Sequence, residues 1–266
     1  MLLVIDTGNT HTVVGLYDPA ATPGDGRRPE AGLLDHWRLA TNAERTEDEY
    51  ALLIQEFLGF HGMTLQGDVG GVAVSSGVPA VTVALRAMTR RYLGFDAVVL
   101  GPGVKSGMSV LYDNPHEVGA DRIANAVGAY DLYGGPAIVV DLGTATTFDV
   151  ITGDAGYLGG AITPGVEISM EALFRRAALL RRVELVEPRS VVGRNTMESI
   201  QSGVVYGYAS LIDGMIERIE AELGEATTIA TGGLAHLIAP HTSVQFHEPW
   251  LTLHGLRIVY EKNTGG

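Results

Sequence analysis

Residues 2–17 read LLVIDTGNTHTVVGLY, and this stretch decides the fold. An apolar run, Leu2–Ile5, stops at the polar turn Asp6-Thr7-Gly8-Asn9-Thr10, and a second β-forming run follows at Val13–Tyr17. Two such runs around a Gly/Asn turn predict a β-hairpin. The aspartate that ends the first strand, with the small polar residues after it, is the first candidate binding site.

The same pattern returns 135 residues later in the chain. Val140-Asp141-Leu142-Gly143-Thr144 repeats the strand end and turn, and Phe148–Ile151 resumes the β pattern. A repeated strand–Asp–turn–strand unit predicts two halves of similar fold. A capping box at Thr46–Glu49 predicts a helix start, and strand-like and helix-like segments alternate around it, which predicts an α/β protein.

The residue types in the two turns suit phosphate binding. Backbone N–H groups and hydroxyls at a tight tip form a concavity for phosphate oxygens, and the aspartate can hold a divalent cation directly or through water. An ordinary β-turn also uses Asp, Gly and Asn. Two copies, with Thr231-Gly232-Gly233 after a third strand, favour phosphate binding. The glycine pair fits either close approach to an adenine or ribose, or a simple strand-to-helix turn.

A second cluster, Gly119-Ala120-Asp121-Arg122, lies at the start of a predicted helix over Val118–Tyr130. Asp121 could orient and deprotonate an alcohol while Arg122 holds an anionic substrate. From spacing alone, a favourable helix-dipole position for Asp121 and a surface ion pair for Arg122 are the simpler explanation. Thr196, before a predicted helix over Met197–Leu223, is either its N-cap or a substrate ligand. The glycine-containing run Gly203–Tyr208 predicts close helix packing.

The composition of the 266 residues excludes several classes of protein. Without cysteine there is no disulfide framework, thiolate zinc site or cysteine nucleophile. A formal charge of −13 disfavours nucleic-acid and anionic-lipid partners. The histidines lack metal-ligand spacing, and the sequence has neither a P-loop nor a nucleophile elbow. No stretch reads as a signal peptide or a membrane span, and we expect a protein that binds neither nucleic acid nor membrane.

Eight motifs stand in the order found in type III pantothenate kinases, and the chain resembles that family over nearly its whole length. They are Asp6–Thr10, Gly101–Gly103, Tyr112–Pro115, Gly119–Arg122, Asp141–Thr147, Gly159–Gly165, Asn195-Thr196 and Thr231–Gly233. The sequence departs from the family pattern at His11, Ser106 and Arg181, and in a longer loop over Asp18–Gly32.

The resemblance implies the fold of the acetate and sugar kinase/Hsp70/actin superfamily. This is a pair of duplicated ribonuclease H-like halves, each a mixed sheet with flanking helices, with a cleft between them. The halves would be residues 1–114 and 115–266, with the last residues packing back on the first half. It also implies a cytoplasmic homodimer that uses ATP to phosphorylate the primary hydroxyl of pantothenate, the first step of coenzyme A biosynthesis.

The resemblance assigns roles to residues as well. Asp121 would be the general base, Asp141 would hold a monovalent cation, K⁺ or NH₄⁺, and Asp6 would hold Mg²⁺ through the ATP phosphates. Pantothenate would contact Tyr112, Gly119, Ala120, Asp121, Arg122 and Thr196. ATP would contact Asp6, Thr7, Gly8, Asn9, Thr10, His11, Thr12, Val13 and Thr144. Two alternatives remain open: a kinase of another small alcohol on the same fold, and a catalytically inactive nucleotide-binding regulator.

Overall fold

The computed structural model describes residues 1–19, 28, 30–177 and 180–265, and the chain divides into two compact units. Unit 1 comprises Met1–Leu132 and Trp250–Gly266, and unit 2 comprises Tyr133–Pro249. The boundary between duplicated halves at residues 114 and 115 stays a prediction. Much of the predicted loop Asp18–Gly32 lies outside the described residues, but the Asp18 N–H donates to the Gly32 carbonyl at 2.8 Å, which closes the base of this loop.

Unit 1 contains a five-stranded mixed sheet in the order β3-β2-β1-β4-β5. The predicted hairpin is confirmed: β1 and β2 are antiparallel, with Asp6 opposite Val13. β3 continues the antiparallel arrangement, whereas β4 and β5 run parallel to β1. The strands in the chain before unit 2 are β1 (Leu2–Thr7), β2 (His11–Tyr17), β3 (Leu33–Ala40), β4 (Gly71–Ser76), β5 (Val98–Val99) and β6 (Ser109–Val110).

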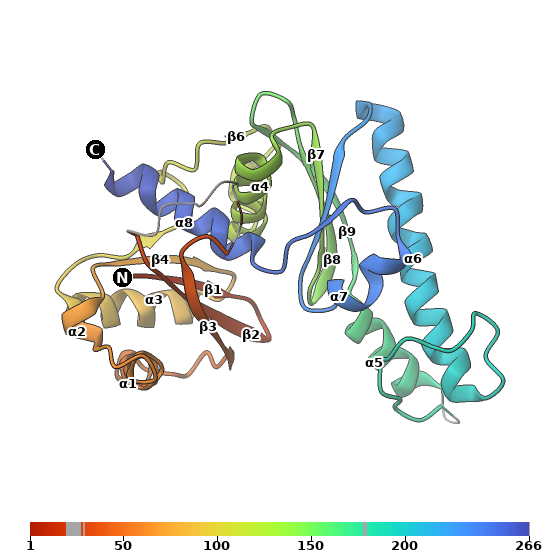
Figure 1. Cartoon of the computed structure of the whole chain (residues 1–266), viewed down its shortest axis with the longest axis horizontal. Helices are drawn as coiled ribbons and strands as arrows, with labels where there is room; N and C mark the ends of the chain where they lie inside the picture. The colour runs from red at the N-terminus through yellow and green to blue at the C-terminus, as the bar shows by residue number, and fades with distance from the viewer. Residues whose placement is uncertain (20–27, 29, 178–179, 266) are drawn as a thin grey trace. The chain divides into compact units, whose positions relative to one another are not determined.

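Helices cover both faces of this sheet, and its strands β1 and β4 are buried along nearly their whole length. Leu3 and Ile5 belong to a core with residues of α1 and α3, and Figure 1 shows α4 and α8 on the opposite side of the sheet. Such near-continuous apolar strands are typical of a sheet buried between helices. The helices are α1 (Glu47–Gly59), α2 (Leu65–Asp68), α3 (Pro79–Met88), a π-helix η1 (Thr89–Leu93), a 3₁₀ turn η2 (Pro115–Glu117), α4 (Ala120–Tyr133) and α8 (Leu251–Thr264).

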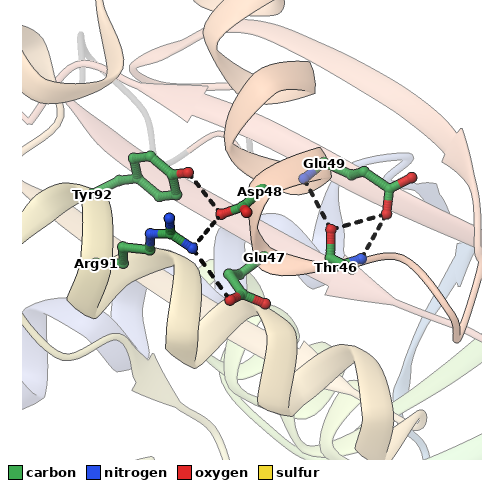
Figure 2. Close-up of polar contacts among 6 residues, drawn as sticks. All are labelled: Thr46, Glu47, Asp48, Glu49, Arg91 and Tyr92. Atoms are coloured by element: carbon green, nitrogen blue, oxygen red, sulfur yellow. Dashed lines mark hydrogen bonds and ion pairs between the residues drawn. The ribbon is translucent and has the colours of Figure 1, made fainter.

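The capping box predicted for α1 is confirmed (Figure 2). The Thr46 N–H donates to Glu49 Oε2 at 2.7 Å, and the Glu49 N–H donates back to Thr46 Oγ1 at 3.4 Å. The same view shows α1 joined to η1, because Asp48 accepts a 2.7 Å hydrogen bond from the Tyr92 hydroxyl and lies 2.8 Å from Arg91 Nη1. The start of α1 is therefore fixed by its own cap and by a neighbouring helix.

Unit 2 repeats the strand topology of unit 1. Its strands follow the order β11-β10-β7-β8-β9, in which β7, β8 and β9 are antiparallel and β10 and β11 run parallel to β7. The predicted duplication is therefore present in the sheets themselves. The elements are β7 (Ala137–Leu142), β8 (Ala145–Ile151), β9 (Gly156–Pro164), α5 (Val166–Arg176), α6 (Thr196–Leu223), β10 (Thr227–Thr231), α7 (Ala235–Ile238), η3 (Ala239–His241) and β11 (Phe246–His247).

Two local predictions are wrong. The N-cap of α6 is Asn195, whose side chain accepts from the Glu198 N–H at 2.9 Å, so Thr196 is the first helical residue. The expected close helix packing at Gly203–Tyr208 is also absent, since a Cβ added at Gly203 or Gly207 would meet no atom within 4 Å.

Close helix packing occurs instead between α4 and α8. A Cβ added at Gly255 would lie 1.8 Å from the Ala124 carbonyl oxygen, and one at Gly128 would lie 2.7 Å from the Leu251 carbonyl oxygen. Neither glycine can gain a side chain without moving backbone, so α8 packs directly against the backbone of α4, the helix that carries Asp121 in its first turn.

Candidate active site

Asp6 and Asp121 come together in unit 1. Asp6 lies at the carboxyl end of β1, level with Ser75 on β4, and the buried Ser75 hydroxyl donates a hydrogen bond to Asp6 Oδ1. Burial raises the pKa of Asp6 to about 7, the Ser75 hydrogen bond opposes this rise, and the negative charge of Asp121 adds to it. The two carboxylates are thus close enough to repel each other, although 115 positions separate them in the sequence.

Asp121 occupies the first turn of α4, as predicted, and its side chain is exposed. Its Oδ1 accepts from the Arg122 N–H at 2.9 Å, which holds the carboxylate over the helix start. Gly119 makes room for that orientation, since a Cβ at Gly119 would lie 2.5 Å from Asp121 Oδ1. Acidic side chains are common at this end of a helix because of the helix dipole. The structure therefore presents an ionisable oxygen at a fixed and accessible place.

Three other substrate-site candidates of unit 1, Gly119, Ala120 and Arg122, lie at this helix start, and Tyr112 precedes it in the chain. Arg122 is only 9% exposed, so it does not lie on the surface, where the simpler interpretation of the sequence placed it. Tyr112, Gly119 and Ala120 are half-buried. A mostly buried guanidinium beside half-buried small residues suits recognition of a carboxylate.

The tip of the β1–β2 hairpin is exposed where ATP phosphates are predicted to bind. Asn9, Thr10 and His11 are exposed, whereas Thr7 and Thr12 are buried. The Gly8 N–H donates to the His11 carbonyl at 2.9 Å, which closes the turn. Val13 is half-buried opposite Asp6.

Two hydroxyl residues of this region were missed by the sequence analysis: Ser75, which contacts Asp6, and Thr41, which contacts the hairpin tip. Thr41 Oγ1 donates to the Gly8 carbonyl at 2.7 Å. Each residue stands at or just beyond the end of a strand, β4 for Ser75 and β3 for Thr41. The sequence shows that each is a hydroxyl residue near the end of a strand. Which turn that hydroxyl contacts follows only from the order of the strands in the sheet.

In unit 2, Asp141 holds the position in β7 that Asp6 holds in β1. It lies level with Thr231 on β10, and Gly232 follows with a φ of 93°. A Cβ at Gly232 would lie 2.5 Å from Asp141 Oδ1 and 2.6 Å from the Leu142 nitrogen, so this glycine lets the strand end approach Asp141. Of the pair Gly232-Gly233, the first glycine therefore has a role in packing.

The second hairpin turn is tight. The Gly143 N–H donates to the Ala145 carbonyl at 3.1 Å, and Thr144 is exposed at the tip. A Cβ at Gly165 would lie 2.2 Å from the Thr144 carbonyl oxygen, which requires glycine at the start of α5. Thr196 is exposed in the first turn of α6. Of the predicted site residues, unit 2 therefore carries Asp141, Thr144 and Thr196, and unit 1 carries the rest.

The donor set suits a magnesium ion that arrives with a nucleotide. Within the described ranges, no group of three or more His, Asp or Glu side chains could hold a metal by itself. Mg²⁺ commonly takes one or two carboxylates and completes its shell with phosphate oxygens and water. The partly buried carboxylate of Asp6, with a raised pKa and Asp121 nearby, fits that requirement.

The chain matches known proteins over its full length. The family model described as type III pantothenate kinase matches residues 2–218. The type III pantothenate kinase of Streptomyces griseus is 53% identical over 272 residues, which cover 99% of this chain and 98% of the relative. That of Thermobifida fusca is 48% identical over 270 residues, covering 99% and 100%. The chain belongs to the type III pantothenate kinase family.

Solved structures confirm the fold of this family member. An activator of 2-hydroxyisocaproyl-CoA dehydratase from Clostridium difficile, with bound ADPNP, superposes with a TM-score of 0.58 at 10% identity and covers 99% of this chain and 96% of its own. A ROK family glucokinase from Streptomyces griseus, with glucose and AMPPNP, gives 0.52 at 13% identity, covering 99% and 100%. At these identities the likeness concerns the fold alone, and it confirms the predicted α/β class with two mixed sheets. None of the helices in the described ranges has the length and apolar content that a bilayer crossing requires.

Proposed function

We propose that this chain transfers the γ-phosphoryl group of ATP to the primary hydroxyl of pantothenate, the first step of coenzyme A biosynthesis. The observation that carries this proposal is about 50% identity over nearly the whole chain to type III pantothenate kinases. A sugar as acceptor has weaker support, because the likeness to the glucokinase concerns the fold alone. Since Asp6, Asp121 and Asp141 are all present, an inactive regulator is also disfavoured.

Asp121 is the general base of the proposed reaction. Its exposed carboxylate at the start of α4 accepts the hydroxyl proton while the oxygen–phosphorus bond forms and the bond from phosphorus to the ADP oxygen breaks. Because phosphoryl transfer is loose, the base acts mainly by orienting the attacking oxygen. Arg122 and the first amides of α4 hold the carboxylate of pantothenate. Tyr112, Gly119, Ala120 and Thr196 are the other residues that we assign to pantothenate binding.

The residues Asp6–Val13 and Thr144 hold ATP. The exposed hairpin tip offers amides and hydroxyls to the phosphates, and Asp6 holds Mg²⁺ through the phosphates. When bound, the magnesium ion neutralises charge that builds on the transferred group. Asp141 holds a monovalent cation, K⁺ or NH₄⁺, and the enzyme acts as a homodimer in the cytoplasm, as in the family it belongs to.

The decisive experiment is an ADP-release assay with pantothenate, ATP, magnesium and potassium, run on the wild type and on Asp121→Asn. We expect turnover in the wild type and a loss of roughly 100-fold or more in the variant, with an unchanged circular-dichroism spectrum. Asp113→Asn, which removes a nearby exposed carboxylate outside the assigned site, is the matched control and should keep its rate.

Each proposed feature can fail separately in this assay. Near wild-type turnover of Asp121→Asn would reject the role of Asp121 as base. Phosphorylation of hexoses in place of pantothenate would reject the substrate. Nucleotide binding without transfer to any acceptor would favour the inactive regulator.

A further inference from the structure

Thr41 joins the phosphate-binding hairpin to the rest of unit 1 through three hydrogen bonds. Its hydroxyl donates to the Gly8 carbonyl at 2.7 Å and lies 3.0 Å from the hydroxyl of the buried Thr12. Its backbone N–H donates to the Thr10 carbonyl at 3.0 Å. A single residue, about thirty positions away in the sequence, thus contacts the tip at both of its sides.

We propose that Thr41 is a positioning residue that fixes the peptide planes of the hairpin tip for ATP binding. This inference rests on the proposed assignment of Asp6–Val13 to the ATP phosphates.

The planarity of the peptide bond gives the physical reason. In a trans peptide the carbonyl and the following N–H point in opposite directions and rotate together. Thr41 holds the carbonyl of Gly8, so it also sets the direction of the Asn9 N–H. It holds the carbonyl of Thr10 and in this way sets the direction of the His11 N–H. Both amides are turned away from Thr41 and belong to the exposed tip residues.

Thr41 can hold the tip because Thr41 itself is held on both sides. It follows β3 directly, whose last residue Ala40 is paired with His11. After Thr41 the chain turns, since the Glu44 N–H donates to Asn42 Oδ1 at 2.9 Å and the Arg45 N–H donates to the Asn42 carbonyl at 3.2 Å. The capping box at Thr46 then starts α1 (Figure 2). The segment between a paired strand and a capped helix has little freedom to move.

Such fixed amides matter for affinity. Donors that already point at a phosphate need no ordering when the ligand binds, whereas a mobile tip loses conformational entropy at that step. Removing the Thr41 hydroxyl would free the Gly8 carbonyl and with it the Asn9 amide.

The test compares Thr41→Val, which keeps the shape and the backbone bond but removes the hydroxyl, with Thr41→Ser, which restores it. By titration calorimetry with MgATP we expect about 10-fold weaker binding for Thr41→Val and near wild-type binding for Thr41→Ser. In the nucleotide-free protein, hydrogen exchange of the amides in residues 8–11 should be faster in Thr41→Val. Thr41→Ala serves as the second variant if the valine does not fold. Thr82→Val, which removes a similar hydroxyl bond inside α3, is the control and should change neither readout.

Thr10→Val, which removes an exposed tip hydroxyl, separates this proposal from the one on which it rests. If Thr10→Val weakens MgATP binding but Thr41→Val and Thr41→Ala bind like the wild type, the role of Thr41 is overturned and the hairpin assignment stands. If none of these variants weakens binding, the hairpin assignment fails and the role of Thr41 fails with it. Weaker binding by Thr41→Ser, equal to that of Thr41→Val, would also overturn the role of the hydroxyl.

Discussion

The environment of Asp6 disfavours the charged form of its carboxyl group. Asp6 lies in the part of unit 1 where burial and the charge of Asp121 both raise its pKa, and the Ser75 hydrogen bond compensates only in part. Perturbed carboxylates of this kind cluster at functional sites. The nucleotide-free protein therefore contains an unfavourable charge that a bound cation would relieve.

This arrangement predicts that Asp6→Asn stabilises the nucleotide-free protein at neutral pH. The pKa of Asp6 is about 7 in the folded protein and 3.8 as the reference value for the unfolded chain. Below the lower value the carboxyl is protonated in both states, so its charge has no effect. Between about pH 4 and pH 7 the folded state binds the Asp6 proton more tightly than the unfolded chain, so the free energy of unfolding falls as the pH rises through this range. Above about pH 7 Asp6 is charged in both states, and the folded protein carries the full destabilisation. The cost is at most about 4 kcal/mol.

The measurement is the melting temperature of wild type and Asp6→Asn between pH 4 and pH 8, in EDTA and without nucleotide. The variant should be more stable at pH 8, and the difference should vanish toward pH 4. Asp113→Asn shows the effect of removing an exposed carboxylate. Equal stability of wild type and Asp6→Asn at pH 8 would contradict the prediction.

At the scale of elements, the sequence predicted what local patterns control. The hairpins, the helix that Asp121 starts and the cap of α1 depend on residues close together in the chain, and all were found. The partnership of Ser75 with Asp6 depends on the parallel pairing of β4 with β1, and the glycines that matter for helix packing, Gly128 and Gly255, lie on different helices. Such contacts are fixed by tertiary packing, so no local pattern identifies them.

The elements of unit 2 also predict self-association. Several large apolar side chains are exposed on β9 and on α5, the helix that follows it in the chain, although isolated ones are normal on any surface. They are Leu158 at 40%, Ile162 at 64%, Ile168 at 45% and Leu173 at 41% exposure. We expect a homodimer that covers part of this set, and light scattering coupled to gel filtration should give about 56 kDa, twice the 28.2 kDa of one chain. Ile162→Glu should shift the mass toward one chain, whereas a wild type of about 28 kDa would contradict the dimer.

At the scale of the whole molecule, the residues assigned to the reaction are divided between the two units. Asp6 and Asp121 belong to unit 1, and Asp141 belongs to unit 2. Turnover should therefore depend on residues of both units, whereas the melting experiment on Asp6 tests a residue of unit 1. The proposed cation at Asp141 in unit 2 can be tested without a mutation, by changing the monovalent salt in the assay.

We therefore expect turnover to rise sharply when sodium is replaced by potassium or ammonium at constant ionic strength. Asp141 supplies a hard anionic oxygen beside a strand end that Gly232 allows to approach closely, and ions of different size would fill that place unequally. Asp141→Asn should lose most of this dependence, while Asp154→Asn, which removes an exposed turn carboxylate of the same unit, should keep it. Equal rates in the three salts would argue against a cation site. A wild-type response in Asp141→Asn would instead place the cation elsewhere, because the preference among the ions would then not depend on the Asp141 carboxylate.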